Sequence, residues 1–420
     1  MDKLVFIGGG VATCFSVIEL LNRGYPGHKI TIIEKGKSAF ERKPNETVFG
    51  FLGAGGFSDG KVVYSLNQGG ELTKYTGEEK GNELIKRTKH LILQFHPEPG
   101  TIKINSEPTL PDFIRNSSFT LRKFECWHLG TDYLYEMSKI IQKFLEDNGV
   151  NLIFDTTINN IVFENKSIWG EFQNFITSFD RCIIAVGKGG TDLIDRLIKK
   201  YNLKTESKSV QIGVRFQSKN IYFEKINNLI YDWKLEKKYG DVGVRSFCVC
   251  QNGFICVENV FDGLVSYNGH SYNDVKKRTD KINFGIMLEV PNINDPLQFT
   301  LDLVKRCNEG GKAKIYNPNK LQSSIYITIE EFEKIYGEYA MIIIDFINEL
   351  NKMFGFGNDY ELYIPEIKYL TNEVVVDKND LSIINHPNIY IIGDALSSRG
   401  LFVAIGQGLH LSDFLLKKGV

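Results

Sequence analysis

The sequence predicts an α/β protein in which a three-layer domain is interrupted by a mainly β insertion. Three observations lead to this prediction. Residues 3–34 have the length and the spacing of apolar residues that are typical of a strand, a glycine turn, a helix and a second strand. Two further apolar runs, 181–187 and 388–392, are typical of buried strands. Between about 210 and 290, strand-like runs alternate with turn signals and show little helical periodicity.

The composition is that of an ordinary globular protein with room for two domains. The chain has 420 residues, of which 42% are hydrophobic and 24% are charged. Its 50 basic and 51 acidic residues give a net charge of -1, so charge suggests neither a nucleic-acid nor a membrane partner. No apolar stretch approaches the roughly 20 residues of a membrane span. Seven scattered cysteines, an odd number, favour a reducing compartment, and we expect a cytoplasmic protein.

The remaining elements follow from the spacing of apolar residues. Residues 35–81 show no sustained period, and their many glycines favour a long functional loop. Helices are expected near 84–95, 133–145, 191–201, 297–307 and 330–354 and at the C-terminus, and strands near 151–163 and 170–179.

The first motif with chemical content is the glycine turn after the first strand. Gly8 and Gly10 allow a tight turn and close approach of the backbone to a phosphate, and Val11 and Ala12 open the helix. The helix N-terminus would stabilise a pyrophosphate. Thr13 stands where a third glycine is expected. This pattern predicts a Rossmann-like dinucleotide site, and the alternative is a plain glycine-rich turn.

Glu34 and Lys35 follow the second strand. A carboxylate at this place can accept hydrogen bonds from both ribose hydroxyls of a dinucleotide. The negative charge of Glu34 would repel a 2′-phosphate, so we do not expect NADP at this site.

The C-terminal segment carries a second motif. A strand ends at Gly393-Asp394, and a helix follows Gly400, Leu401 and Phe402. The pattern resembles the second cofactor motif of the two-dinucleotide-binding-fold flavoproteins, which implies that Asp394 contacts the ribityl chain of FAD. The turn at Ala185 and Gly187 resembles a third element of these folds.

Further segments carry a more specific resemblance. They are 53–61, 128–132, 185–187 with Asp192, 212–215, 246–250 and 268–272. With them the chain resembles the uncharacterised FAD-dependent dehydrogenase family over nearly its whole length. The resemblance implies a discontinuous FAD-binding domain, 1–208 and 356–420, and an inserted substrate domain, 209–355. Thr13 departs from the family pattern, as does Gln251, where a proline is expected.

The loop 53–61 is expected to wrap the cofactor with backbone amides. Gly55, Gly56 and Phe57 form its centre, and Ser58 is either a cofactor contact or a turn residue. Lys61 either stabilises reduced, anionic flavin or is a solvated loop lysine.

Five residues outside the cofactor motifs are candidates for the reaction. His128 and His270 could donate or accept a proton, although His270 could equally lie in a surface turn at Asn268-Gly269. Arg215 could bind a substrate carboxylate or phosphate, or be an ordinary ion-pair partner. Cys248 and Cys250 alternate on a strand, so both should point to one face. Buried thiols are favoured there over a redox pair or metal site, with Cys248 a candidate substrate contact.

These features predict an FAD-dependent oxidoreductase that moves a hydride between flavin N5 and a small organic substrate. Only one nucleotide motif is complete, so NADH or NADPH would serve as a transient reductant. We expect a monomer or homodimer, with no bound metal. A flavin-dependent monooxygenase is the alternative within the same fold, and a non-catalytic binding protein on a flavoprotein fold is the alternative of another class.

Overall fold

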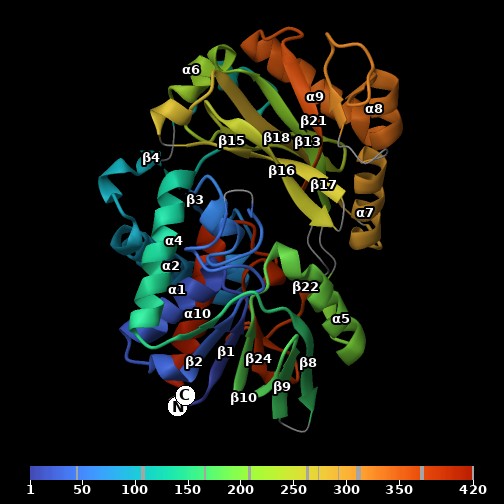
Figure 1. Cartoon of the computed structure of the whole chain (residues 1–420). Coiled ribbons are helices and arrows are strands. Elements are labelled where there is room, and N and C mark those ends of the chain that lie inside the picture. Colours follow the sequence, from blue (N-terminus) through green and yellow to red (C-terminus); the bar gives the residue numbers. More distant parts are fainter. Residues whose placement is uncertain are drawn as a thin grey trace. The chain divides into compact units, whose positions relative to one another are not determined.

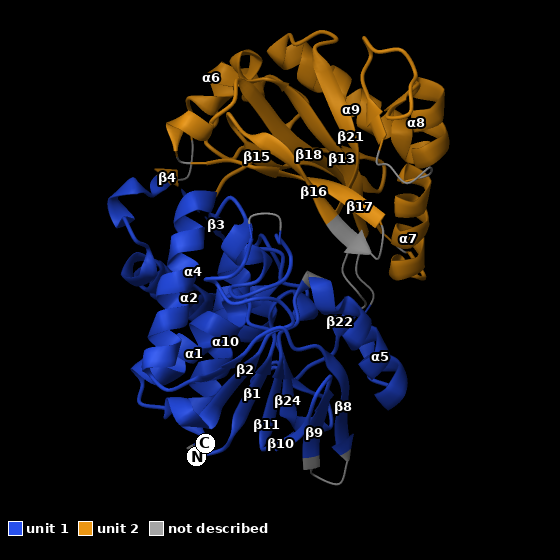
Figure 2. Cartoon of the chain, in the orientation of Figure 1, with its two compact units in different colours: residues 1–103, 127–206, 370–420 blue, residues 104–126, 207–369 orange. Residues whose placement is uncertain are grey.

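A computed structural model gives the fold of the chain and divides it into two compact units (Figure 2). Unit 1 comprises residues 1–103, 127–206 and 370–420, and unit 2 comprises residues 104–126 and 207–369. The structure describes residues 1–43, 46–105, 109–164, 167–206, 210–261, 264–272, 274–291, 293–308, 314–368 and 373–418.

Unit 1 is built on a mostly parallel sheet. Its strands follow the order β23-β24-β11-β1-β2-β7, and only the edge pair β23 and β24 is antiparallel. The apolar runs of the sequence form the central strands, which are buried on both faces as parallel strands usually are. The strands are β1 (Leu4–Ile7), β2 (Ile30–Ile33), β7 (Asn151–Ile153), β11 (Arg181–Ile184), β23 (Ser382–Ile383) and β24 (His386–Ile391).

Two further layers cover this sheet (Figure 1). Helices α1, α2, α4 and α10 lie on one side, and an antiparallel sheet of β10, β9 and β8 lies on the other with α5. The sequence therefore predicted the three-layer α/β class correctly. The helices are α1 (Val11–Asn22), α2 (Leu72–Phe95), α4 (Thr131–Asp147), α5 (Thr191–Tyr201) and α10 (Leu401–Lys417). The additional strands are β8 (Ile158–Glu164), β9 (Ser167–Phe172), β10 (Ile176–Phe179), β3 (Lys61–Tyr64), β12 (Thr205–Glu206) and β22 (Glu373–Val374). Strands β4 (Lys103–Asn105) and β6 (Glu125–His128) span the points at which the chain passes between the two units.

Helices α1 and α10 pack closely through small residues. A Cβ added at Gly408 would overlap the carbonyl oxygen of Ala12, and the hydroxyls of Ser16 and Ser412 lie 2.8 Å apart. Thr13 is fully buried, and its hydroxyl donates to the carbonyl oxygen of Gly8 at 2.7 Å. Gly408 thus allows the close contact between α1 and α10, and Thr13 is accommodated at the third motif position by its hydrogen bond to Gly8.

Unit 2 is built on a mostly antiparallel sheet, in which only the edge pair β19 and β20 is parallel, and its described residues form five α-helices. The sheet order is β20-β19-β21-β13-β18-β15-β14-β5, with a separate hairpin of β16 and β17. The strands are β5 (Thr120–Arg122), β13 (Val210–Lys219), β14 (Lys234–Tyr239), β15 (Val242–Cys250), β16 (Phe254–Phe261), β17 (Leu264–His270), β18 (Lys281–Val290), β19 (Lys314–Tyr316), β20 (Tyr326–Ile327) and β21 (Tyr360–Lys368). The helices are α3 (Asp112–Arg115), α6 (Glu224–Asn227), α7 (Pro296–Cys307), α8 (Ile329–Tyr336) and α9 (Glu338–Phe354).

The two faces of this sheet differ in polarity. Alternate residues of β13, Val214 and Phe216 among them, join an apolar core with residues of α8 and α9. Arg215 belongs to the opposite face, where the β16–β17 hairpin lies so close that a Cβ at Gly269 would overlap the guanidinium. The expected turn at Asn268-Gly269 is thus wrong, because these residues lie within β17 and pair with β16.

Three boundaries differ from the expectations. Residues 104–126 join unit 2, because β5 pairs with β14 there. Strand β21, expected beyond the insertion, pairs with β13 inside the unit 2 sheet. Residues 35–81 are not one long loop, because they contain a 3-10 turn (Ala54–Phe57), β3 and the start of α2, which is kinked at Gly77. No helix in the described part of the chain is both long and apolar enough to cross a membrane.

Candidate functional site

Unit 1 contains a pocket at the carboxyl ends of its parallel strands. Open α/β sheets bind ligands at this edge. The lining draws on residues that follow β1, β2, β11 and β24, together with the loops at 48–55 and 156–158. Most of the residues expected to bind a cofactor line this pocket: Gly8, Gly10, Val11, Ala12, Glu34, Lys35, Gly55, Ala185, Gly187, Gly393 and Asp394.

The glycine turn has the geometry that its sequence predicts. Gly8 has a φ of +103°, and a Cβ there would overlap the carbonyl oxygen of Ala185. Gly10 is the N-cap of α1, and a Cβ there would meet no atom within 4 Å. The first glycine is therefore required by the fold, whereas the second leaves open space at the helix N-terminus. An anion can be stabilised in that space.

Glu34 holds the turn and a loop together. One carboxylate oxygen accepts a hydrogen bond from the backbone N–H of Gly9 at 2.7 Å, and the other accepts from Gly36 and Gly50, both at 2.9 Å. The sequence predicted only a ribose contact for this residue. Its structural role was missed because the partner at Gly50 lies 16 residues away.

Arg42 fixes the same loop from within and was not predicted. Its guanidinium donates to the carbonyl oxygens of Glu46, Phe51 and Gly53 at 2.8, 2.8 and 2.7 Å. It also lies 4.1 Å from the ring centroid of Phe57. Burial lowers the pKa of Arg42 to about 10. No local sequence pattern signals this role, because an arginine in a polar loop is normally exposed.

The loop 53–61 contributes to the pocket through its first residues. A Cβ at Gly55 would lie 2.6 Å from a methyl group of Val11, so only glycine fits against α1. Gly56, Phe57 and Ser58 do not line the pocket. Phe57 is buried against Tyr135, and Ser58 donates to the carbonyl oxygen of Gly55 and accepts from the N–H of Gly60. Ser58 therefore has the geometry of a turn residue.

Lys61 and His128 lie on neighbouring segments of unit 1. The ammonium of Lys61 lies 2.6 Å from a carboxylate oxygen of Asp59, and both side chains are only 6% exposed. The backbone N–H groups of Leu129 and Gly130 donate to the carbonyl oxygens of Gly60 and Asp59. His128, at the end of β6, is 1% exposed. Lys61 is thus a buried ion-pair partner and not a solvated loop lysine.

The C-terminal motif places Asp394 in the pocket at the start of a short 3-10 turn. Gly393 precedes it with a φ of +73°, and the side-chain oxygen of Gln407 on α10 accepts from the Gly393 N–H at 2.8 Å. The helix begins as expected after Gly400. Leu401 and Phe402 pack in the core of unit 1 instead of lining the pocket, and Phe402 lies beside Tyr64.

Several lining residues were not predicted. They are Ile7, Ile33, Val48, Phe49, Leu52, Thr156, Thr157, Ile158, Val186, Gly189, Gly190, Asp192, Leu193, Arg196 and Ala404, whereas Gly53 and Ala54, which also line the pocket, belong to the predicted loop 53–61. Phe49 packs against Gly189 so closely that a Cβ there would overlap its ring.

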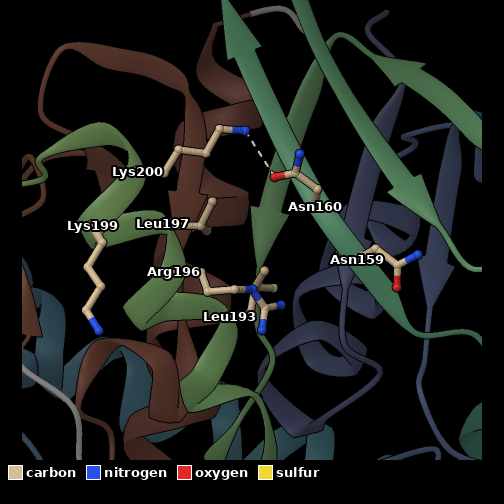
Figure 3. A pocket seen from close by; sticks show the side chains of 7 residues that line it. All are labelled: Asn159, Asn160, Leu193, Arg196, Leu197, Lys199 and Lys200. Atoms are coloured by element: carbon tan, nitrogen blue, oxygen red, sulfur yellow. Dashed lines mark hydrogen bonds between the residues drawn. The ribbon is translucent and has the colours of Figure 1, made fainter.

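Arg196 and Leu193 also border a second hollow, between α5 and β8, which Figure 3 shows. There the ammonium of Lys200 donates to the side-chain oxygen of Asn160 at 3.1 Å.

Arg215 is held by protein groups in unit 2. Its guanidinium donates to Glu366 at 3.3 and 3.4 Å, to the side-chain oxygen of Asn283 at 2.6 and 2.9 Å, and to the carbonyl oxygen of Cys248 at 2.9 Å. It is fully buried. Burial has the largest single effect and lowers the pKa of Arg215, but the charge of Glu366, its hydrogen bond and the other neighbouring groups together raise the pKa above its ordinary value. The ion-pair interpretation therefore describes Arg215 better than a substrate contact.

The other two candidates of unit 2 lie near this arginine. Cys248 is half-buried at the end of β15, and Cys250 beside it is buried. His270, the last residue of β17, is 6% exposed and stacks on the ring of Phe254 with centroids 5.9 Å apart. His270 therefore does not lie in a surface turn.

Comparison with known proteins gives distant similarities. No family model matches the chain. An uncharacterized protein of Clostridium beijerinckii is 23% identical over 318 residues, which cover 68% of this chain and 51% of the relative. The chain thus spans about half the length of the curated relative it matches.

Solved structures resemble the chain over nearly its whole length at low identity. A variant of halogenase PltM in complex with FAD has 11% identity and a TM-score of 0.47, with 99% of this chain and 69% of that chain covered. CmlS, a flavin-dependent halogenase, has 11% identity and a TM-score of 0.47, with 100% and 59% covered. Tetracycline destructase Tet(51) has 11% identity and a TM-score of 0.41, with 100% and 82% covered.

Proposed function

We propose that unit 1 binds FAD in its pocket and that the chain is an FAD-dependent oxidoreductase. One observation carries this proposal: the glycine turn at Gly8–Gly10, Glu34 and Asp394 line one pocket although they come from opposite ends of the sequence. A dinucleotide site at the carboxyl ends of parallel strands needs these three features, a phosphate turn and two hydroxyl acceptors.

The lining residues fit this cofactor. Gly10 and Gly187 leave open space where a Cβ would stand, so the backbone can approach a pyrophosphate. A carboxylate accepts about four hydrogen bonds, so Glu34 can hold its loop and still accept a ribose hydroxyl. Asp394 would accept from the ribityl chain. FAD, when bound, supplies the acceptor or donor of a hydride, and the protein supplies binding and electrostatics.

Two residues of unit 1 are assigned to the reaction. His128 would hold or move a proton of the substrate, and Lys61, which lies outside the pocket lining and is paired with Asp59, would stabilise reduced flavin through its ammonium N–H groups. Unit 2 would bind the small organic substrate, and His270 and Cys248 are its proposed contacts. NADH or NADPH would act as a transient reductant, since the pocket serves one dinucleotide.

The cofactor and the direction of the reaction can be tested together. The purified protein is denatured and the released cofactor identified by chromatography, and the intact protein is mixed anaerobically with NADH or NADPH. Released FAD supports the proposal, and bleaching by a pyridine nucleotide assigns a reductase. Hydroxylated product formed with oxygen would instead assign a monooxygenase. If the protein neither releases nor takes up FAD, the assignment of FAD as cofactor is refuted, and the alternative of a non-catalytic binding protein is favoured.

The role of His128 is tested by His128→Gln, with His90→Gln on the exposed side of α2 as the matched control. We expect His128→Gln to slow turnover and flatten its pH profile while flavin content stays unchanged. His90→Gln should leave both unchanged. An unaltered pH profile in His128→Gln would remove this residue from the reaction.

A further inference from the structure

Two cysteines at the end of β15 lie unusually close together. The sulfur atoms of Cys248 and Cys250 are within 4.8 Å of each other. Residues two apart in a regular strand have Cα atoms separated by about 6.7 Å, and their side chains run roughly parallel. Here Cys248 has a φ of +50°, and the pairing of β15 with β18 is irregular between Phe247 and Cys250. The resulting bulge turns the two sulfur atoms toward one another.

A buried cation lies against this pair. The guanidinium of Arg215 donates to the sulfur of Cys250 at 3.2 Å and to the carbonyl oxygen of Cys248 at 2.9 Å. A hydrogen-bonding cation stabilises a thiolate and makes it a better nucleophile at neutral pH. Glu366 and the side-chain oxygen of Asn283 also accept hydrogen bonds from this guanidinium, so the arginine is held in place beside the sulfur.

Four other cysteines lie in environments that disfavour the thiolate. Burial raises the pKa of Cys14, Cys182 and Cys307 well above the ordinary value. Burial, with the charge of Glu258, raises the pKa of Cys256 on β16 to about 12. All seven cysteines are described, and all are thiols and not disulfides. Cys256 is therefore an internal control in the same unit.

The two cysteines differ in solvent exposure, and this difference determines which sulfur would react first in a thiol–disulfide exchange. Cys248 is half-buried, whereas Cys250 is buried beside Arg215. An external disulfide can reach only the more exposed sulfur. The buried sulfur can then attack its neighbour within the protein, because thiol–disulfide exchange needs a thiolate close to the bond that breaks.

We infer that Cys248 and Cys250 form a redox-active dithiol that closes to an intramolecular disulfide by exchange with a low-molecular-weight disulfide. The thiolate of Cys248 attacks one sulfur of the external disulfide, forms a mixed disulfide and releases the first small thiolate, which takes up a proton. The thiolate of Cys250 then attacks the Cys248 sulfur and releases the second. Two protein thiols are oxidised and one external disulfide is reduced to two thiols.

This assignment shares Cys248 with the substrate contacts of the proposed function, but its chemistry does not pass through the flavin. It concerns residues of unit 2 alone and requires no bound cofactor. Its failure would leave the FAD proposal untouched, and loss of FAD would leave the exchange unchanged.

The test uses the full chain and oxidised glutathione under anaerobic conditions. After incubation, remaining thiols are alkylated, and the protein is analysed by mass spectrometry. We expect the loss of two hydrogens, no alkyl group on Cys248 or Cys250, and full alkylation of Cys256 after denaturation. Glutathione buffers of increasing oxidised fraction should give one midpoint, and excess dithiothreitol should restore both thiols.

Three variants separate the steps. Cys250→Ser should accumulate a stable glutathione adduct at Cys248, because the second attack is lost. Cys248→Ser should show neither adduct nor disulfide, since Cys250 is buried, and Cys256→Ser should behave as the parent protein. The inference is overturned if the parent keeps both thiols in the most oxidising buffer, or if Cys250→Ser forms no adduct. It is equally overturned if Cys256 is oxidised as readily as the pair.

Discussion

The two units place polar chemistry in their interiors by different means. The pocket of unit 1 is lined by glycine turns and apolar side chains, and its one buried carboxylate, Glu34, is stabilised by hydrogen bonds from three backbone N–H groups. Unit 2 instead buries the side-chain ion pair of Arg215 and Glu366, both fully buried, between its sheet and a hairpin.

This difference determines what each region tolerates. The glycine turn of the unit 1 pocket depends on the absence of side chains. A methyl group added at one of its glycines therefore either strains the fold or fills the space for a ligand. A buried ion pair stabilises the fold only while both partners are present, because removal of one partner leaves the other charge in a low-dielectric interior. The predictions below test each half of this comparison, beginning with the largest effect.

Arg215→Met should destabilise the protein most. The substitution leaves the buried carboxylate of Glu366 with only the ammonium of Lys368, which lies 3.3 Å away. It also removes the donors to Asn283 and to the carbonyl oxygen of Cys248, so we expect a loss of about 3 kcal/mol in the free energy of unfolding. The matched control is Gln217→Met on the same strand, which loses only uncharged donors to Glu361 and Tyr363 and should cost about 1 kcal/mol. Urea denaturation measures both. Equal losses of unfolding free energy in the two variants would show that the buried ion pair contributes no more to stability than an uncharged hydrogen bond.

Gly8→Ala should have the next largest effect. The residue combines a φ of +103° with a Cβ position that overlaps a backbone carbonyl, so we expect a loss of about 2 kcal/mol or more. Gly10→Ala is the control, because its Cβ meets nothing and its φ is -75°. Its stability should stay within about 1 kcal/mol of the parent. Thermal unfolding distinguishes the two, and similar melting temperatures would contradict the account of the turn.

Acid should destabilise the two units in different pH ranges. Burial lowers the pKa of His96, His386 and His410, all in unit 1. The unfolded chain then binds protons more readily than the folded one, so their contribution is present above about pH 6.5 and is lost as pH falls through the folded pKa. In unit 2, hydrogen bonds from Lys352 and Ser118 lower the pKa of Glu349 to about 2, so its contribution persists to much lower pH.

The size of the histidine effect is limited. Each histidine contributes a slope of at most about 1.4 kcal/mol per pH unit below pH 6.5. His96→Gln, which keeps an acceptor for the N–H of Glu98, should flatten the profile between about pH 6.5 and 5. Urea denaturation across that range is the measurement, and a slope unaffected by the substitution would assign the acid sensitivity elsewhere.

The sequence predicted the features that depend on neighbours along the chain. The turn at Gly8 and Gly10, Asp394 after its strand, and the start of α10 all follow from local spacing and lie where expected. The missed features depend on distant partners. Arg215 meets Glu366 across 151 positions, and Arg42 looks like an ordinary loop arginine until the loop closes around it.

Two errors have the same origin. Asn268-Gly269 carries a strong turn signal, but the glycine is needed because the hairpin crosses directly over Arg215. The loop prediction for 35–81 failed because β3 has only four residues and α2 begins with a kinked, polar turn. Short elements that are stabilised by tertiary packing contain too few residues to show a periodic pattern of apolar positions in the sequence.

The flavin content of the purified protein tests the central claim most directly. The FAD-to-protein ratio is measured from the visible absorption of the parent, of Gly10→Ala and of Gly100→Ala, an exposed glycine of unit 1 whose Cβ position is equally open. The account predicts bound FAD in the parent and in Gly100→Ala, and affinity reduced about tenfold or more in Gly10→Ala, a loss of about 1.4 kcal/mol, at unchanged melting temperature. A colourless parent that takes up no FAD, or unchanged affinity in Gly10→Ala, would contradict it.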